Sequence, residues 1–107
     1  MVNLGEFEEV VLLAVLRLED EAYAIPIREE IRRRAHRGVA RGALYTALDR
    51  LEEKGLLTSR MSDPRPERGG RSRRYFKATA RALTALRASR RARLGLWQGL
   101  ETLLRKQ

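Results

Sequence analysis

The feature of this 107-residue sequence that most constrains its fold is a change of periodicity along the chain. Apolar residues recur at helical spacing in three successive stretches within residues 4–54. Two short runs of strand-like composition follow, residues 56–61 and 72–78, and the loop between them is rich in proline, glycine and arginine. From Thr79 the helical spacing returns and predicts one long helix to the C-terminus. The sequence therefore predicts a mainly α fold with a small β-hairpin.

Residues that favour helix ends agree with this division. Asn3 followed by Glu6 fits a capping box at the start of a first helix over about residues 4–18. Pro26 is tolerated in the first turn of the second helix, and Gly55 ends the third as a left-handed cap. Three helices followed by a hairpin are the order of a winged helix-turn-helix, in which the hairpin is the wing. We predict a winged helix-turn-helix DNA-binding domain over residues 1–78 and a C-terminal dimerisation helix over residues 79–107.

Charge is distributed unevenly along the chain. Residues 1–63 contain ten Lys or Arg and twelve Asp or Glu, whereas residues 64–107 contain thirteen Lys or Arg and two Asp or Glu. The formal net charge of +9 therefore comes from the second part of the chain. A basic segment of this kind favours an anionic partner, nucleic acid before membrane. The alternative is a solvated basic surface.

The composition excludes several classes of activity. The chain has no cysteine and one histidine, His36, which excludes disulfides, thiolate catalysis and cysteine-ligated zinc. No nucleophile has a base beside it, so we expect no enzyme activity, no metal site and no cofactor. The longest apolar run, residues 10–16, is too short to span a bilayer, and the N-terminus lacks the basic-then-apolar order of a signal peptide. We expect a cytoplasmic protein with no membrane segment.

The third helix sorts its polar residues along its length. Its apolar side consists of Leu44, Ala47, Leu48 and Leu51. On the opposite side Tyr45 and Thr46 lie in the first half, whereas Asp49 and Glu53 lie in the second. In a helix-turn-helix the N-terminal half of this helix enters the major groove, where carboxylates would meet phosphates. The residues that we predict to contact DNA are Arg41, Gly42, Tyr45, Thr46 and Arg50. The alternative for Tyr45 is packing against the neighbouring helix, and for Asp49 and Glu53 we expect plain solvation.

The loop of the hairpin supplies a second group of candidate contacts. Four arginines, of which Arg74 is the last, surround a Gly-Gly pair. Paired glycines let a loop bend closely over a DNA backbone or groove, and arginine suits both phosphate and a narrow minor groove. A mononucleotide phosphate loop is the competing interpretation, but no helix follows and no Gly-Lys-Ser/Thr ending is present. The contacts that we predict in this wing are Arg68, Gly69, Gly70, Arg71 and Arg73.

Three segments of the chain resemble a known family. The segments "LGEFEEVVLLAVL", "GALYTALDRLEEKGLL" and "RGGRSRRYFKAT" are similar to those of the PadR-like bacterial transcriptional regulators, over about residues 4–80. The resemblance implies a repressor with Arg41, Tyr45, Thr46 and Arg50 in the DNA groove and Arg71 and Arg73 in the wing. Ala40 stands where the family often has a serine cap, which should weaken the start of the third helix by about 1 kcal/mol. Short regulators often control their own genes, so we also expect autoregulation.

Apolar residues in excess of what one small domain can cover predict a two-fold homodimer. The leucines at 94–104 have nothing within the chain to cover them, and the first helix has more apolar surface than one neighbour can bury. The residues that we predict at the dimer interface are Leu4, Phe7, Val11, Leu94, Trp97, Leu100 and Leu104. A dimer places two recognition helices about one duplex turn apart, roughly 34 Å, and so predicts a palindromic operator.

Trp97 is the only tryptophan, and it lies on the face that should meet the partner copy. Two facing indoles can hold a flat aromatic molecule between them, and the resemblance implies a small aromatic compound as a candidate effector. The alternative is that Trp97 is an interface anchor.

Two other binding functions stay open. An RNA-binding module fits the charge, although the sequence lacks the row of exposed aromatic residues that stacks unpaired bases. A dimerisation or interaction module without sequence-specific duplex binding fits the apolar C-terminal helix. Salt-dependent binding to duplex DNA separates these functions from a DNA-binding regulator.

Overall fold

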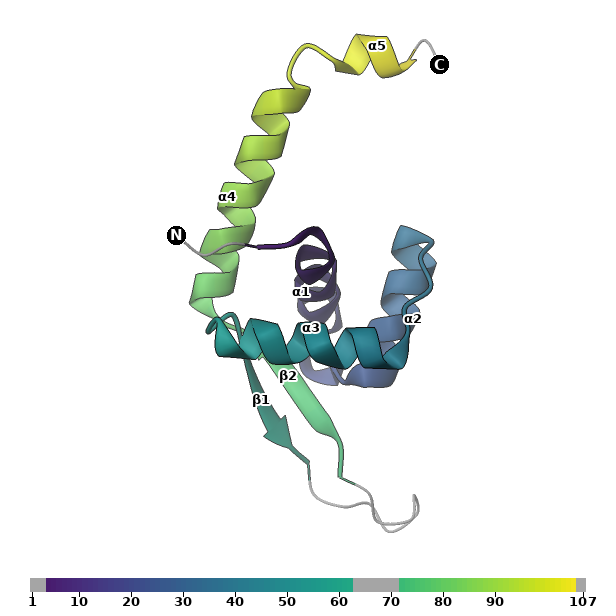
Figure 1. The fold of residues 1–107 in the computed structure, drawn as a ribbon, viewed down its shortest axis with the longest axis vertical. Helices are drawn as coiled ribbons and strands as arrows, with labels where there is room; N and C mark the ends of the chain where they lie inside the picture. The colour runs from purple at the N-terminus through teal and green to yellow at the C-terminus, as the bar shows by residue number, and fades with distance from the viewer. Residues whose placement is uncertain (1–3, 63–71, 106–107) are drawn as a thin grey trace.

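The computed structural model describes residues 4–62 and 72–105. Its elements in chain order are α1 (Glu6–Leu18), the short 3-10 turn η1 (Glu19–Glu21), α2 (Ala24–Ala35), α3 (Arg41–Glu53), β1 (Leu57–Met61), β2 (Arg74–Ala78), α4 (Ala80–Trp97) and α5 (Glu101–Arg105). In Figure 1, α1, α2 and α3 form one body, the hairpin projects from one side of it, and α4 leads away on the other side. The winged helix-turn-helix with a C-terminal helix is confirmed.

Helix α1 begins at Glu6 rather than at Leu4, which corrects the predicted start. The backbone N–H of Gly5 donates to Glu8 Oε1 at 2.8 Å, so Glu8 has the capping role that the sequence suggested for Glu6. Glu6 instead pairs with Arg37 at 2.9 Å. The predicted cap, Asn3, lies outside the described residues.

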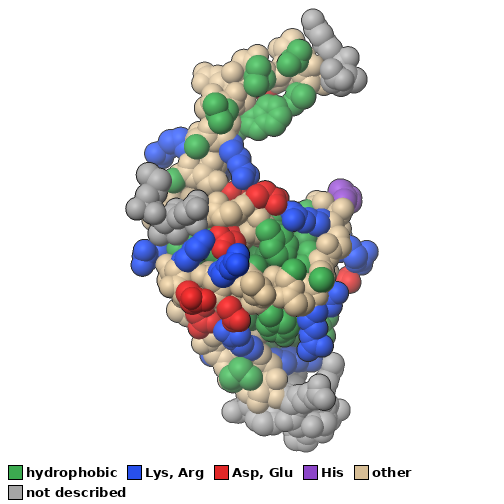
Figure 2. Space-filling view, in the orientation of Figure 1, with side chains coloured by type: hydrophobic (Ala, Val, Ile, Leu, Met, Phe, Trp, Pro, Cys, Tyr) green, Lys and Arg blue, Asp and Glu red, His purple; other side chains and the backbone are tan. Residues whose placement is uncertain are grey.

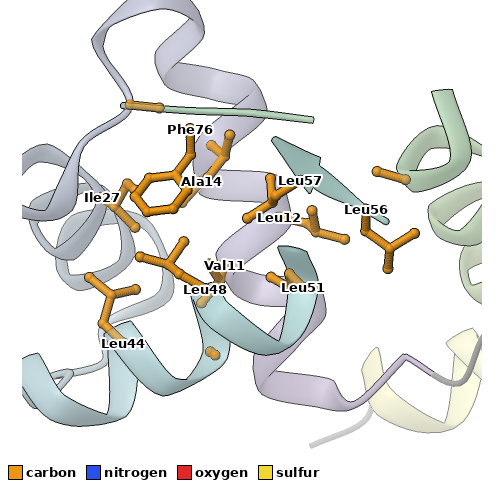
Figure 3. Packing of buried hydrophobic residues seen from close by; sticks show 14 of the residues in the cluster. Val11, Leu12, Ala14, Ile27, Leu44, Leu48, Leu51, Leu56, Leu57 and Phe76 are labelled. Atoms are coloured by element: carbon orange, nitrogen blue, oxygen red, sulfur yellow. The ribbon is translucent and has the colours of Figure 1, made fainter. Parts of the chain in front are cut away.

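One hydrophobic core joins the helices and the hairpin (Figure 3). It includes Val11, Leu12, Ala14 and Val15 from α1, Ile27 and Ile31 from α2, Leu44, Ala47, Leu48 and Leu51 from α3, Leu56 and Leu57 at the start of the hairpin, and Phe76 from β2. All four residues of the predicted apolar side of α3 are buried. The core therefore fixes which side of α3 remains at the surface.

The two strands form an antiparallel pair in which Leu57 lies opposite Ala78 and Met61 lies opposite Arg74. The backbone N–H of Phe76 donates to the Ala22 carbonyl at 2.9 Å. This bond attaches β2 to the segment between η1 and α2. The base of the wing is therefore held by both its own ladder and the helical body.

The turn after α3 also anchors the start of α4. Gly55 has φ +77°, as a left-handed helix end requires, and the N–H of Leu56 donates back to the Leu51 carbonyl at 2.9 Å. Thr79 Oγ1 donates to the Gly55 carbonyl at 2.8 Å and accepts from the Ala82 N–H at 3.3 Å. Thr79 thus caps α4 and joins it to the end of α3.

The prediction of one long C-terminal helix is wrong, because the helix breaks after Trp97. Gly99 has φ +89°, and α5 resumes at Glu101. Glycine adopts this left-handed conformation without the steric penalty of a side chain, so it ends helices readily. Figure 1 shows α5 turned across the end of α4. Within residues 4–62 and 72–105, no helix is both long enough and apolar enough to cross a membrane.

Candidate nucleic-acid interface

The surface side of α3 carries all five residues that the sequence assigned to DNA contact. Arg41, Gly42, Thr46 and Arg50 are exposed, and Tyr45 is half-buried at the edge of the core. Figure 1 shows α3 crossing the face of the body beside which the hairpin projects. The helix and the wing can therefore approach one elongated ligand from the same side.

The N-terminal half of α3 combines an open backbone with an arginine held over an aromatic ring. The Arg41 guanidinium carbon lies 5.9 Å from the centre of the Tyr45 ring. Apart from the adjacent residues and the backbone of its own helix, no atom of residues 4–62 and 72–105 lies within 4 Å of where a Cβ at Gly42 would be. Ala40, the N-cap residue, supplies no side-chain hydrogen bond, as its sequence predicts. The N–H groups of the first turn therefore lack a side-chain cap from Ala40, and helix N-termini of this kind favour anions.

The carboxylates in the second half of α3 were expected to contact solvent, but two of them contact the wing. Asp49 and Glu52 both bind Arg74 of β2, with Nη1–Oδ1 at 3.1 Å and Nη2–Oε1 at 2.5 Å. The Ser59 hydroxyl of β1 donates to Glu52 Oε2 at 2.8 Å. The expectation that Asp49 is only solvated is therefore wrong, whereas Glu53 is exposed. Asp49 and Glu52 therefore contact the strands of the wing.

Arg73, at the loop end of the strand ladder, is held by two tyrosines. Its guanidinium carbon lies 4.5 Å from the centre of the Tyr23 ring, just before α2, and the Tyr23 and Tyr75 ring centres are 5.2 Å apart. The hydrogen bond between Arg73 and the Tyr75 hydroxyl raises the pKa of the guanidinium further above its ordinary value. Arg60 covers Tyr75 at 4.9 Å. These rings keep two cations beside the hairpin.

The sequence analysis did not identify Tyr23, Arg60 or Tyr75. The contact between Arg60 and Tyr75 could have been predicted from the pairing register of the two strands. Arg60 and Tyr75 lie directly opposite each other in the ladder, so a cross-strand contact follows once the register is known. The predicted contacts Arg68, Gly69, Gly70 and Arg71 lie outside the described residues.

The three arginines in the last turn of α2, Arg32, Arg33 and Arg34, form intramolecular ion pairs. Arg33 and Arg34 bind Glu30 at 2.6 and 2.7 Å, and Arg17 of α1 binds the same carboxylate at 3.1 Å. Hydrogen bonds from Arg33 and Arg34 lower the pKa of Glu30 below its ordinary value. Arg32 pairs with Glu29 at 2.7 Å. These three arginines of α2 are thus each paired with a glutamate of the same helix.

The residues predicted at a dimer interface divide into an exposed group and a packed group. Leu94, Trp97, Leu100 and Leu104 keep between 45% and 55% of their surface exposed, and Figure 2 shows hydrophobic side chains gathered on the arm formed by the end of α4 and α5. Leu4 and Phe7 are half-buried, and Arg37 covers the Phe7 ring at 4.9 Å. Val11 is fully buried within the chain, which corrects its placement at an interface: α3 and the other helices already enclose it.

We compared the chain with known protein families, curated proteins and solved structures. The sequence profile of the Transcriptional regulator PadR-like family matches residues 12–88. No curated protein matches the chain.

Several solved structures share the fold over most of their length. A PadR family transcription regulator from hypervirulent Clostridium difficile R20291 is 23% identical, with 92% of this chain and 98% of that chain covered and a TM-score of 0.73. A PadR-like transcription factor from Bacteroides fragilis is 26% identical, covering 91% and 88% at a TM-score of 0.74. A padr family transcriptional regulator from Eggerthella lenta DSM 2243 is 25% identical, covering 92% and 86% at a TM-score of 0.70.

Proposed function

Because the chain belongs to the PadR-like family of transcriptional regulators, we propose that it binds a specific sequence of double-stranded DNA and represses transcription there. The observation that carries this proposal is the sorting of α3. Its exposed first half presents Arg41, Gly42 and Thr46 without a carboxylate, and its later carboxylates Asp49 and Glu52 are both paired with Arg74 of the wing. A helix that enters the major groove by its N-terminal half requires this distribution of charge.

Each candidate residue has a proposed role that follows from its chemistry. Tyr45 and Thr46 offer hydroxyl and apolar groups to base edges, and Gly42 lets the backbone approach closely. Arg41 and Arg50 lie toward the phosphates on either side. The wing adds Arg73 at the loop end of its ladder, together with Arg68, Gly69, Gly70 and Arg71. Base contacts by α3 supply sequence preference, and the arginines supply affinity that falls with salt.

We propose that the DNA-bound form is a two-fold homodimer joined through the C-terminal arm. Residues 1–78 serve as the DNA-binding unit and residues 79–107 as the dimerisation unit. In α4, Ala82 is the residue buried within the chain, whereas the apolar residues of the arm are exposed. We propose that Leu4, which lies beside α4, and the half-buried Phe7 extend the interface. A monomer by sedimentation at micromolar concentration contradicts this arrangement.

The dimer has two consequences for function. It places two α3 helices about one duplex turn apart, roughly 34 Å, and so requires a palindromic operator. We propose that one such operator lies upstream of the regulator's own gene and that the protein binds it in the cytoplasm. The protein then acts by binding DNA rather than by catalysing a reaction. A reporter under that upstream region should lose expression when the protein is present.

The arm also supports a proposal about regulation by a small molecule. Trp97 is 45% exposed, and two-fold symmetry brings its copy close, so a flat aromatic compound could lie between the two indoles. Planar aromatic cations and phenolic acids should then quench Trp97 fluorescence saturably and change DNA affinity. Quenching that leaves DNA affinity unchanged identifies Trp97 as an interface anchor only.

The experiment that tests DNA binding is selection of duplexes from a randomised pool by the purified protein. The proposal predicts an enriched palindrome whose affinity falls linearly with salt on logarithmic axes, by a slope of about 0.9 per phosphate contact. Enrichment of single-stranded RNA over duplex DNA supports the RNA-binding alternative. No enrichment, with an intact dimer, supports an interaction module.

A further inference from the structure

Arg74 joins the wing to α3, together with Ser59 of β1. Its three nitrogens each contact a different residue: Nε donates to Ser59 Oγ at 3.3 Å, Nη1 to Asp49 Oδ1 at 3.1 Å and Nη2 to Glu52 Oε1 at 2.5 Å. Its guanidinium also lies 4.9 Å from the centre of the Phe76 ring. We call Arg74, Asp49, Glu52 and Ser59 the Arg74 cluster. The cluster connects α3, β1 and β2 through one planar group.

The geometry of the cluster limits what Arg74 can do. The side chain of Arg74 is 33% exposed, and its nitrogens are directed to two carboxylates and a hydroxyl within the chain. Partial burial opposes its charge, but hydrogen bonds to Glu52 and Asp49 raise its pKa above the ordinary value. A guanidinium held by several fixed acceptors is pre-organised, and it loses less entropy for each bond than a flexible cation would.

The position of the Arg74 cluster determines which parts of the fold it holds together. Asp49 and Glu52 lie late in α3, whereas Arg74 follows directly on the backbone pair between Ser62 and Arg73 that closes the described end of the hairpin. A change in the angle between α3 and the hairpin would break at least one of the three contacts of Arg74. The cluster therefore couples the orientation of the wing to that of α3.

We propose that Arg74 is a positioning residue that locks the wing at a fixed angle to α3, so that both elements engage one duplex as a single unit. This inference rests on the proposed DNA binding. Arg74 acts here through Asp49 and Glu52, and it does not itself contact the DNA.

The rival role for Arg74 is a direct phosphate contact, and the two roles predict opposite signs for one substitution. Glu52→Gln removes a negative charge from α3 and weakens its hold on Arg74, because the amide oxygen still accepts a hydrogen bond but no longer forms an ion pair. If Arg74 contacts DNA phosphates directly, both the lost negative charge and the weaker hold on Arg74 raise duplex affinity. If Arg74 positions the wing, loss of the anchor lowers affinity for the selected duplex despite the favourable change of charge.

Glu53→Gln is the matched control, because it removes the same charge from the neighbouring, exposed position of α3. We expect Glu53→Gln to leave affinity unchanged or to raise it slightly. We expect Glu52→Gln to weaken binding to the selected duplex roughly tenfold, within the range for loss of a DNA-contact group. The salt slope should become shallower by about 0.9 for each wing contact with phosphate that is lost.

The double variant Glu52→Gln/Arg74→Gln completes the test. Because both substitutions break the same cluster, the double variant should bind no more weakly than Arg74→Gln alone. Arg74→Lys should recover only part of the affinity, since one ammonium group cannot reproduce the planar fork that bridges two carboxylates. Thermal melting followed by circular dichroism should show that each variant is folded. Where Arg74→Gln fails to fold, Asp49→Asn serves as the milder substitution.

Three results decide the inference. A loss for Glu52→Gln but not for Glu53→Gln, with non-additive coupling to Arg74→Gln, supports it. Equal gains in affinity for Glu52→Gln and Glu53→Gln, or additive effects of Glu52→Gln and Arg74→Gln, overturn it while leaving the proposed function intact. Failure of the wild-type protein to select any duplex overturns the proposed function first.

Discussion

Replacement of Glu8 by glutamine should destabilise the folded chain in a pH-dependent way. Glu8 is buried, and its Oε1 accepts hydrogen bonds from the Gly5 N–H at 2.8 Å and from Lys54 Nζ at 2.7 Å. It therefore ties the start of α1 to the end of α3. Glutamine keeps an acceptor for Gly5 but removes the charge that pairs with Lys54.

The size of the stability loss in Glu8→Gln follows from how far Glu8 and Lys54 are buried. A hydrogen bond to a charged group contributes about 1.5–3 kcal/mol to stability when it is buried. The Lys54 side chain is 32% exposed, against 11% for Glu8, so water screens part of the interaction. We therefore expect Glu8→Gln to lower the free energy of unfolding by about 1–2 kcal/mol at pH 7.

The pH dependence has a definite sign. Burial of Glu8 opposes its ionisation, but the hydrogen bonds from Lys54 and from the Gly5 N–H outweigh burial and lower its pKa below the ordinary 4.5. A carboxylate with a lowered pKa contributes stability above the pKa of the unfolded chain, and this contribution disappears as the pH falls through the folded pKa. The difference between wild type and Glu8→Gln should therefore be constant at neutral pH and shrink in acid.

Urea unfolding followed by circular dichroism measures this difference, at one fixed protein concentration because a dimer's stability depends on concentration. Glu53→Gln, at an exposed position of α3, is the control and should change stability by less than about 0.5 kcal/mol. Our reasoning is refuted if Glu8→Gln matches the control at pH 7. It is also refuted if the loss persists unchanged well below pH 4.5.

Three further substitutions test the fold by the same unfolding measurement. Ala40→Ser should stabilise the protein by about 1 kcal/mol, because it adds the missing N-cap acceptor of α3, and no gain would show that the first turn of α3 is satisfied in another way. Leu48→Ala should cost about 2–5 kcal/mol, since Leu48 is fully buried, and a cost below 1 kcal/mol would contradict the packing of Figure 3. Gly55→Ala should cost about 1–2 kcal/mol, because φ is +77° and a Cβ there would lie 3.1 Å from Arg81 Nη1; a stabilised variant would refute the left-handed turn.

The elements of the domain could be predicted from the sequence because each has a strong local signal. Apolar spacing defined α1, α2 and α3, and Gly55 marked the end of α3. The break after Trp97 was missed because the leucine spacing continues across it into α5. Gly99 alone carries the signal there, and a single glycine near the end of a helical pattern also occurs inside helices.

The candidate site was only partly predictable, for a different reason. The exposed residues of α3 follow from the helical wheel, since the core residues fix the opposite side. The partner of Asp49 does not, because Arg74 lies 25 residues later and meets it only when the hairpin folds back. Sequence distance hides such a contact. For the same reason Val11 was assigned to an interface: its spacing identifies an apolar side of α1 but does not say that α3 covers it.

The most direct test of the central claim compares Tyr45→Ala with Arg73→Ala on two duplexes, the selected palindrome and a scrambled sequence of the same composition. Fluorescence anisotropy at several salt concentrations gives both affinities. If the first half of α3 reads base edges, Tyr45→Ala reduces the ratio of specific to non-specific affinity, whereas Arg73→Ala weakens both duplexes alike and lowers the salt slope by about one. Equal effects of Tyr45→Ala on the two duplexes would contradict the assignment of α3 as the recognition helix.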